Sequence, residues 1–197
     1  ETHHGARPAE VLMHEYAHGM LLGSNPEDIE KIWQQMYKRA SLFGFMGAEL
    51  RAISAIDMAL WDLLGKMTDL PVHALLGTYR TKVPAYASTI DGAVKGPLSD
   101  PESYADFAQQ CLEMGYRAFK IHPFVWPDVQ THIDAVLAIG ERVGGKMDLM
   151  LDPFCAIRTF GEALKLGWAC DEWRYLWLED PFKDGGVSAH AHRKLRQ

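Results

Sequence analysis

Four side chains in the second half of this 197-residue sequence have types and spacings suited to acid–base chemistry. Lys120 and His122 are two residues apart, and the carboxylates of Asp152 and Glu179 follow at intervals of about 30 residues. An imidazole titrates near neutral pH, which suits a base that abstracts a proton. A lysine beside it adds positive charge, which favours the neutral imidazole and attracts an anionic substrate. These four positions are therefore the candidates for an active site.

Short apolar runs lead up to these side chains, and each run is followed by a Pro-Phe pair. The three stretches cover residues 117–124, 148–154 and 175–182. An apolar run of this length bounded by proline is typical of a buried strand. Residues two apart share a face of a strand, so we expect Lys120 and His122 to point the same way. By the same alternation we expect Trp177 and Glu179 to share a face.

Segments with apolar residues near the helical period separate these runs. They cover residues 100–114, 127–143 and 159–169, and Thr159 is a suitable N-cap for the last of them. A further strand is expected over residues 81–90. Strand–helix alternation predicts a parallel sheet, with strand ends near residues 90, 122, 152 and 180. Charged residues at the carboxyl ends of three successive parallel strands indicate the rim of an active site.

The first part of the chain is expected to be mostly helical. Residues 24–28 carry helix-start signals, and the glycines and Phe45 at 44–47 break that helix. A second helix over about residues 48–66 is apolar on much of its circumference, so we expect it to be largely buried. The domain boundary is expected near Arg80, which gives a first portion over residues 1–80 and a strand–helix portion over residues 81–197.

The composition indicates which partners the protein binds and in which compartment it is located. Charged residues make up 23% of the sequence and the net charge is −6, which argues against nucleic acid and anionic membranes as partners. No apolar run approaches the roughly 18 residues of a membrane span, and the start of the chain has no signal-peptide pattern. Three cysteines without CxxC spacing indicate reduced thiols in a cytoplasmic protein.

One motif suggests a different chemistry. His14, Glu15 and His18 match the HExxH pattern, in which two histidines one helical turn apart bind zinc and the glutamate serves as base. The longer metzincin pattern requires glycine where Leu21 stands, and Gly19 interrupts the helix. We interpret the two histidines as polar residues near a domain surface, with zinc catalysis as the alternative.

Several ordered motifs resemble those of one enzyme family. The stretch SAIDMALWDLLGK at 54–66, followed by PV at 71–72 and LLG at 75–77, resembles the capping-domain and linker signature of the enolase superfamily. Together with YAS at 86–88, KIH at 120–122, Asp152 and EDP at 179–181, it resembles the mandelate racemase and muconate lactonizing enzyme branch. The resemblance runs from about residue 20 to the end of the sequence.

The resemblance implies a fold and a reaction. It implies an α+β capping domain followed by a (β/α) barrel, of which this chain holds the C-terminal part of the cap and about the first four strands. Members of the superfamily remove a proton next to a carboxylate and form an enediolate stabilised by Mg²⁺. By position, Asp152 and Glu179 correspond to metal ligands, while His122 corresponds to the base and Lys120 to the residue that tunes it. Carboxylate oxygens suit such a hard cation.

Two positions differ from the usual family pattern, and they bear on which reaction we expect. His122 stands where lysine is commoner, which favours an acid-sugar dehydratase over a mandelate racemase, and Phe154 stands where the family often has asparagine. The third metal ligand of the family would follow a fifth strand, beyond Gln197. We therefore expect a fragment of a larger enzyme, homo-oligomeric in its full-length form and poorly active unless another chain completes it.

Three functions remain open at this level. The leading expectation is an Mg²⁺-dependent lyase that abstracts the α-proton of a sugar-derived hydroxy acid and expels the β-hydroxide. The alternative on the same scaffold is a racemase or epimerase, which returns the proton to the other face. The third is a catalytically incomplete chain that associates with other subunits.

Overall fold

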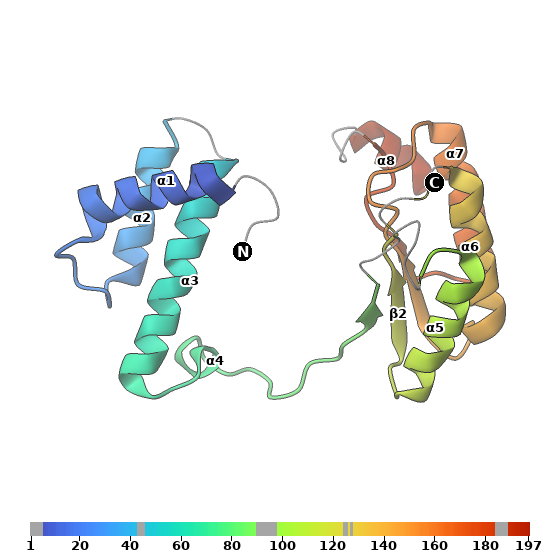
Figure 1. The fold of residues 1–197 in the computed structure, drawn as a ribbon, viewed down its shortest axis with the longest axis horizontal. Coiled ribbons are helices and arrows are strands. Elements are labelled where there is room, and N and C mark those ends of the chain that lie inside the picture. Colours follow the sequence, from blue (N-terminus) through green and yellow to red (C-terminus); the bar gives the residue numbers. More distant parts are fainter. Residues whose placement is uncertain (1–5, 43–45, 90–97, 124–125, 127, 184–188) are drawn as a thin grey trace. The chain divides into compact units, whose positions relative to one another are not determined.

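The computed structural model describes residues 6–42, 46–89, 98–123, 126, 128–183 and 189–197 (Figure 1). The chain divides into two compact units, Glu1–Lys82 and Val83–Gln197. The expected end of the first strand at Ile90, the end of the second run at Phe124 and the helix break at residues 44–45 lie outside the described residues. No helix in the described ranges is long and apolar enough to cross a membrane.

The first unit is a cluster of helices. Its elements are α1 (Ala6–Tyr16), the π-helical turn η1 (Ala17–Leu21), α2 (Ile29–Ala40), α3 (Ala48–Thr68) and α4 (Val72–Leu75). Helices α1 and α2 both pack against α3. Met36, Ala52 and Ile53 are fully buried at the centre of this cluster. Their burial, worth about 1.5–3 kcal/mol for each large side chain, holds the three helices together.

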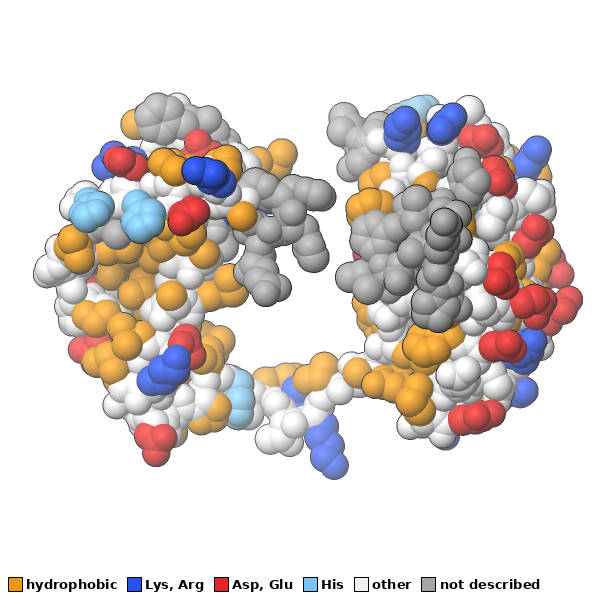
Figure 2. Space-filling view, in the orientation of Figure 1, with side chains coloured by type: hydrophobic (Ala, Val, Ile, Leu, Met, Phe, Trp, Pro, Cys, Tyr) orange, Lys and Arg blue, Asp and Glu red, His pale blue; other side chains and the backbone are white. Residues whose placement is uncertain are grey.

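The expectation that α3 is largely buried is wrong for this unit. Met58, Leu63 and Met67 of α3 are exposed, whereas Ile53 and Ile56 are buried. Figure 2 shows many hydrophobic side chains on the visible face of the first unit. The physical reason is that α1 and α2 supply partners for only part of the circumference of α3 among the described residues.

The second unit alternates strands and helices as the sequence predicts. Its elements are β1 (Ala87–Ser88), α5 (Pro101–Glu113), β2 (Ala118–Ile121), α6 (Val129–Val143), β3 (Asp148–Leu151), α7 (Phe160–Glu172), β4 (Trp177–Leu178) and α8 (Ala189–Leu195). The four strands form one sheet in the order β1-β2-β3-β4, and every neighbouring pair is parallel. The predicted parallel sheet is confirmed.

The first strand is much shorter than predicted. Among the described residues the ladder with β2 covers Ala87 and Ser88, and the Thr89 N–H adds one bond to the Lys120 carbonyl, although the apolar pattern predicts a strand from residue 81. Val83 is 73% exposed, and the segment before Ala87 has no ladder partner among the described residues. An apolar pattern identifies residues that are able to pair, whereas a ladder also requires a neighbouring strand.

Side chains at the starts of the helices fix where each helix begins. The carboxylate of Asp100 accepts the Ser103 N–H at the start of α5. Thr159 and Glu162 form a reciprocal capping box at the start of α7, which confirms the predicted N-cap. Each cap contributes about 1 kcal/mol by satisfying backbone donors that have no partner within the helix.

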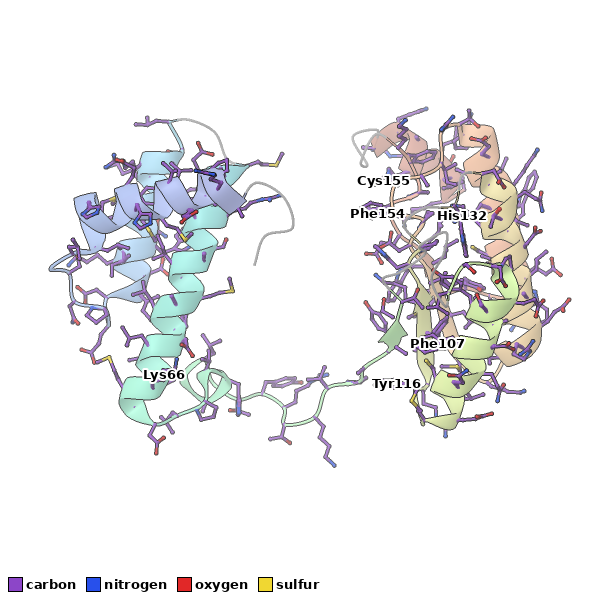
Figure 3. All side chains as sticks on the ribbon, in the orientation of Figure 1. Lys66, Phe107, Tyr116, His132, Phe154 and Cys155 are labelled. Atoms are coloured by element: carbon purple, nitrogen blue, oxygen red, sulfur yellow. The ribbon has the colours of Figure 1, made fainter. Side chains whose placement is uncertain are left out.

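The main core lies between the sheet and the helices that cover one of its faces (Figure 1). Phe119 and Ile121 of β2 are fully buried in this core. The ring of Phe107 on α5, which Figure 3 labels, meets that of Phe119 edge to face at 6.1 Å. Because alternate residues of a strand point to opposite faces, anchoring these two residues directs Lys120 and His122 to the other face.

A close approach between α6 and the segment after α7 gives the first prediction. A Cβ added at Gly140 would overlap the indole of Trp173. Gly140→Ala should therefore lower the free energy of unfolding by about 1–3 kcal/mol, despite the better helix propensity of alanine. Gly161→Ala on α7 is the control, because a Cβ there meets nothing within 4 Å. Urea unfolding of the two variants measures the difference, and equal stabilities would contradict the packing.

The buried His132 gives a prediction for pH. Its side chain on α6 is 1% exposed, and burial lowers its pKa from 6.5 to about 4, although the carboxylate of Asp128 opposes this shift. Folding thus favours the neutral ring. The neutral His132 ring therefore contributes fully to stability above pH 6.5. As the pH falls toward 4, protonation in the unfolded chain lowers the free energy of unfolding by about 3 kcal/mol.

Denaturant unfolding between pH 7 and pH 4 measures this loss. His132→Phe should flatten the pH dependence relative to the wild type, and His14→Phe, at an exposed position, should leave it unchanged. A pH dependence equally steep in His132→Phe would show that other groups cause the acid sensitivity.

Candidate active site

The four predicted residues meet at the carboxyl-end edge of the parallel sheet. Lys120 lies near the end of β2. The residues that directly follow the ends of β2, β3 and β4 are His122, Asp152 and Glu179. The sheet pairing continues past the strand ends, since the Asp152 N–H donates to the Ile121 carbonyl at 2.8 Å. Figure 3 labels Phe154 at this end of the sheet and Tyr116 at the opposite end.

The ammonium group of Lys120 lies between the two carboxylates. Its Nζ donates to Glu179 Oε2 at 3.0 Å and lies 3.5 Å from Asp152 Oδ2. The Lys120 side chain is only 11% exposed, so water screens these charges weakly. This ion triad brings groups that are 59 residues apart in the chain into direct contact.

The imidazole of His122 contacts the same carboxylate. Its Nε2 lies 3.2 Å from Asp152 Oδ2, and its ring meets the ring of Phe154 edge to face at 5.3 Å. The backbone N–H of His122 donates to the hydroxyl of the buried Thr89 at 2.8 Å. The prediction that His122 shares a face with Lys120 is confirmed, because both side chains reach Asp152.

A turn with an unusual backbone holds the carboxylate of Asp152. Its Oδ1 accepts the Phe154 N–H at 3.0 Å, and the Cys155 N–H donates to the Asp180 carbonyl at 2.9 Å. Phe154 and Cys155 have φ angles of 52° and 56°, in the left-handed region. Each such non-glycine residue costs roughly 1–2 kcal/mol, which these hydrogen bonds offset. The turn thereby ties the segment after β3 to the segment after β4.

The ion triad shifts the pKa values of two of its members. Burial would lower the pKa of Lys120, but the hydrogen bond and charge of Glu179 and the charge of Asp152 raise it overall. Burial would raise the pKa of Glu179, but the hydrogen bonds from Lys120 and Trp177 lower it overall. Both side chains are therefore charged at neutral pH.

Three further residues of the site were not assigned a role from the sequence. Trp177 Nε1 donates to Glu179 Oε2 at 3.1 Å, the Tyr86 ring lies 6.0 Å from the Trp177 ring, and Lys120 Nζ lies 5.8 Å from the Tyr86 ring. The hydroxyl of Thr89 holds the backbone after β2. The shared face of Trp177 and Glu179 was the available signal. For Thr89, the available signal was its place at the carboxyl end of the strand expected over residues 81–90.

The donor set can be tested against a metal ion. Asp152 and Glu179 offer hard carboxylate oxygens from neighbouring strands, but no group of three or more His, Cys, Asp or Glu side chains among the described residues is arranged to hold a metal. Mg²⁺ commonly binds through one or two protein carboxylates and keeps several waters. The two carboxylates therefore fit Mg²⁺ and leave its other positions to water or other ligands.

The HExxH residues form no comparable site. His14, Glu15 and His18 are all exposed. Helix α1 ends at Tyr16 and a π-helical turn follows, so the motif does not lie on one regular α-helix. No metal-binding group is found around it in the described part of the first unit. The interpretation of these histidines as surface residues is confirmed.

Both parts of the chain are similar to known protein families. Residues 2–77 match the mandelate racemase / muconate lactonizing enzyme N-terminal domain, and residues 103–197 match the enolase C-terminal domain-like family. A 3,6-anhydro-alpha-L-galactonate cycloisomerase from Streptomyces coelicolor is 35% identical over 91% of this chain and 48% of its own length. An arabinonate dehydratase from Saccharolobus solfataricus is 32% identical over 83% of this chain and 43% of its own length.

A solved structure agrees with these relatives. The crystal structure of D-glucarate dehydratase from Agrobacterium tumefaciens, complexed with magnesium, aligns with this chain at a TM-score of 0.80 and 30% identity. The alignment covers 95% of this chain and 50% of the dehydratase chain. The chain thus spans about half the length of the relatives that it matches. The predicted enolase-type fold is confirmed, and the chain belongs to the mandelate racemase / muconate lactonizing enzyme family of the enolase superfamily.

Proposed function

We propose that this chain contributes to an Mg²⁺-dependent dehydratase that removes the proton α to the carboxylate of an acid sugar. The observation that carries the proposal is the meeting of Lys120, His122, Asp152 and Glu179 at one edge of the sheet. Relatives named as acid-sugar dehydratases and cycloisomerases support this substrate class.

Each side chain has a role in the proposed reaction. Asp152 and Glu179 would hold Mg²⁺, which when bound supplies positive charge for the developing enediolate. His122, oriented by Asp152 and by contact with the Phe154 ring, takes the α-proton. Lys120 adds positive charge two residues along the same face and attracts the substrate carboxylate. Loss of the β-hydroxide, with a proton, then releases water and leaves a keto acid after tautomerisation.

The proposal covers the organisation of the chain as well as its site. Residues 1–80 form a portion of a capping domain, and residues 81–197 form the first half of a (β/α) barrel. Because the chain spans about half the length of its relatives, the activity is proposed for the site completed by the remaining elements. Assembly as a homo-oligomer and a cytoplasmic location remain predictions of the sequence.

Racemisation or epimerisation on the same scaffold is the alternative. It shares the abstraction of the α-proton but differs in the second step, in which the proton returns to the other face and no water is lost. The dehydratases among the relatives favour dehydration. The products distinguish the two reactions, because only dehydration yields a 2-keto-3-deoxy acid.

Calorimetric titration with Mg²⁺ tests the metal site. The purified chain should bind Mg²⁺, and Asp152→Ala should weaken binding at least about tenfold by removing one of two carboxylate ligands. A parallel titration with Zn²⁺ compares the wild type with His14→Ala, the matched variant at the HExxH motif. Tight stoichiometric Zn²⁺ binding that is lost in His14→Ala would replace this proposal with the zinc site.

The base is tested by proton exchange. In D₂O with Mg²⁺, acid sugars should exchange the α-proton at the site once the remaining elements complete it, as followed by NMR, and His122→Asn should lower that rate by at least about 10²-fold. His190→Asn on α8 is the control, because His190 is exposed and lies outside the site. Exchange that survives in His122→Asn would assign the base to another residue.

A further inference from the structure

Lys120 has a place in the site that its role as a tuning residue does not require. Its ammonium contacts Asp152 Oδ2 and Glu179 Oε2, one oxygen from each of the proposed metal ligands. The other oxygen of Asp152 accepts the backbone N–H of Phe154. The oxygens that would ligate a cation are therefore held by a positive charge that belongs to the chain itself.

The negative charges of Asp152 and Glu179 explain why a cation lies between these two side chains. Two ionised carboxylates beside each other repel, and burial of Asp152 strengthens that repulsion by reducing its hydration. The formal charges of Lys120, Asp152 and Glu179 sum to −1. The two carboxylates without Lys120 would carry −2. Lys120 thus offsets part of the negative charge that the two carboxylates concentrate at this point.

We infer that Lys120 is an internal counter-ion which a divalent cation displaces when it binds. This inference rests on the proposed function, because it takes Asp152 and Glu179 as the metal ligands. A divalent cation cannot share Oδ2 and Oε2 with an ammonium group without strong repulsion between the two positive charges. Binding of the cation and pairing of Lys120 with the carboxylates are therefore competing states.

The site offers the displaced ammonium another neighbour. The ring of Tyr86 lies 5.8 Å from Lys120 Nζ, within the range of a cation–π contact. With the divalent cation bound and Lys120 retained, the formal charges sum to +1. A substrate with one carboxylate brings this sum to zero. The exchange therefore couples metal loading to the attraction of an anionic substrate, because it frees a positive charge beside His122.

Metal binding to a neutral variant tests the competition. Lys120→Met keeps an unbranched side chain of nearly the same length and removes its charge, so it should bind Mg²⁺ about tenfold more tightly than the wild type by calorimetry. Lys66→Met is the matched control, because Lys66 also pairs with a carboxylate, that of Asp62, but is exposed on α3. Its Mg²⁺ affinity should equal that of the wild type.

Two outcomes of this titration separate the two proposals. Mg²⁺ binding by the wild type with equal or weaker binding by Lys120→Met would overturn the counter-ion role alone. Binding by neither chain would overturn the proposed metal site and this inference with it. If Lys120→Met does not fold without metal, its recovery of the native circular dichroism spectrum on addition of Mg²⁺ would support the role, and failure to recover would count against it.

Reactivity of the wild-type lysines tests displacement directly. Reductive methylation followed by peptide mass spectrometry gives the labelling rate of each lysine with and without Mg²⁺ at equal ionic strength. Release of Lys120 from the carboxylates should raise its rate several-fold, while Lys66 keeps the same rate. An unchanged or slower rate at Lys120 on saturation with Mg²⁺ would overturn displacement.

Discussion

The electrostatic balance at the carboxyl ends of β2, β3 and β4 is the constraint on which the rest of the site depends. Asp152 and Glu179 bring two carboxylates to adjacent strand ends, and the ammonium of Lys120 lies between them and pairs with both. His122 completes the cluster through Asp152. Removing Lys120 would leave the buried carboxylate of Asp152 without the ammonium beside it, which is costly where hydration is poor. The cluster is therefore one unit in both its structure and its chemistry.

The sheet provides the precision that this balance requires. Parallel pairing of β2 with β3 and of β3 with β4 continues one residue beyond the strands, through the N–H groups of Asp152 and Glu179. The apolar residues on the opposite face of β2, Phe119 and Ile121, lock the register against the helices. A slip of one residue would bury Lys120 in that core and turn Phe119 toward the site. Core packing on one face thus sets the chemistry on the other.

Much of this arrangement follows from local patterns in the sequence. Apolar runs that end in charged residues predicted three of the strands, and the cap at Thr159 predicted the start of α7. The same patterns overestimated the first strand and the burial of α3, because pairing and burial need neighbours that a local pattern does not specify. The contact of Lys120 with both carboxylates was not predicted, since side chains far apart in sequence meet only after the strands have paired.

The sequence by itself determined which residues are available for chemistry and on which strand face each one lies, because alternation along a strand depends only on local geometry. It also identified the family through ordered motifs. Only the tertiary structure decided which groups touch: that Lys120 bridges the two carboxylates, that Trp177 donates to Glu179 and that Thr89 holds His122. Those contacts depend on strand order and register, which result from packing of the whole sheet against its helices.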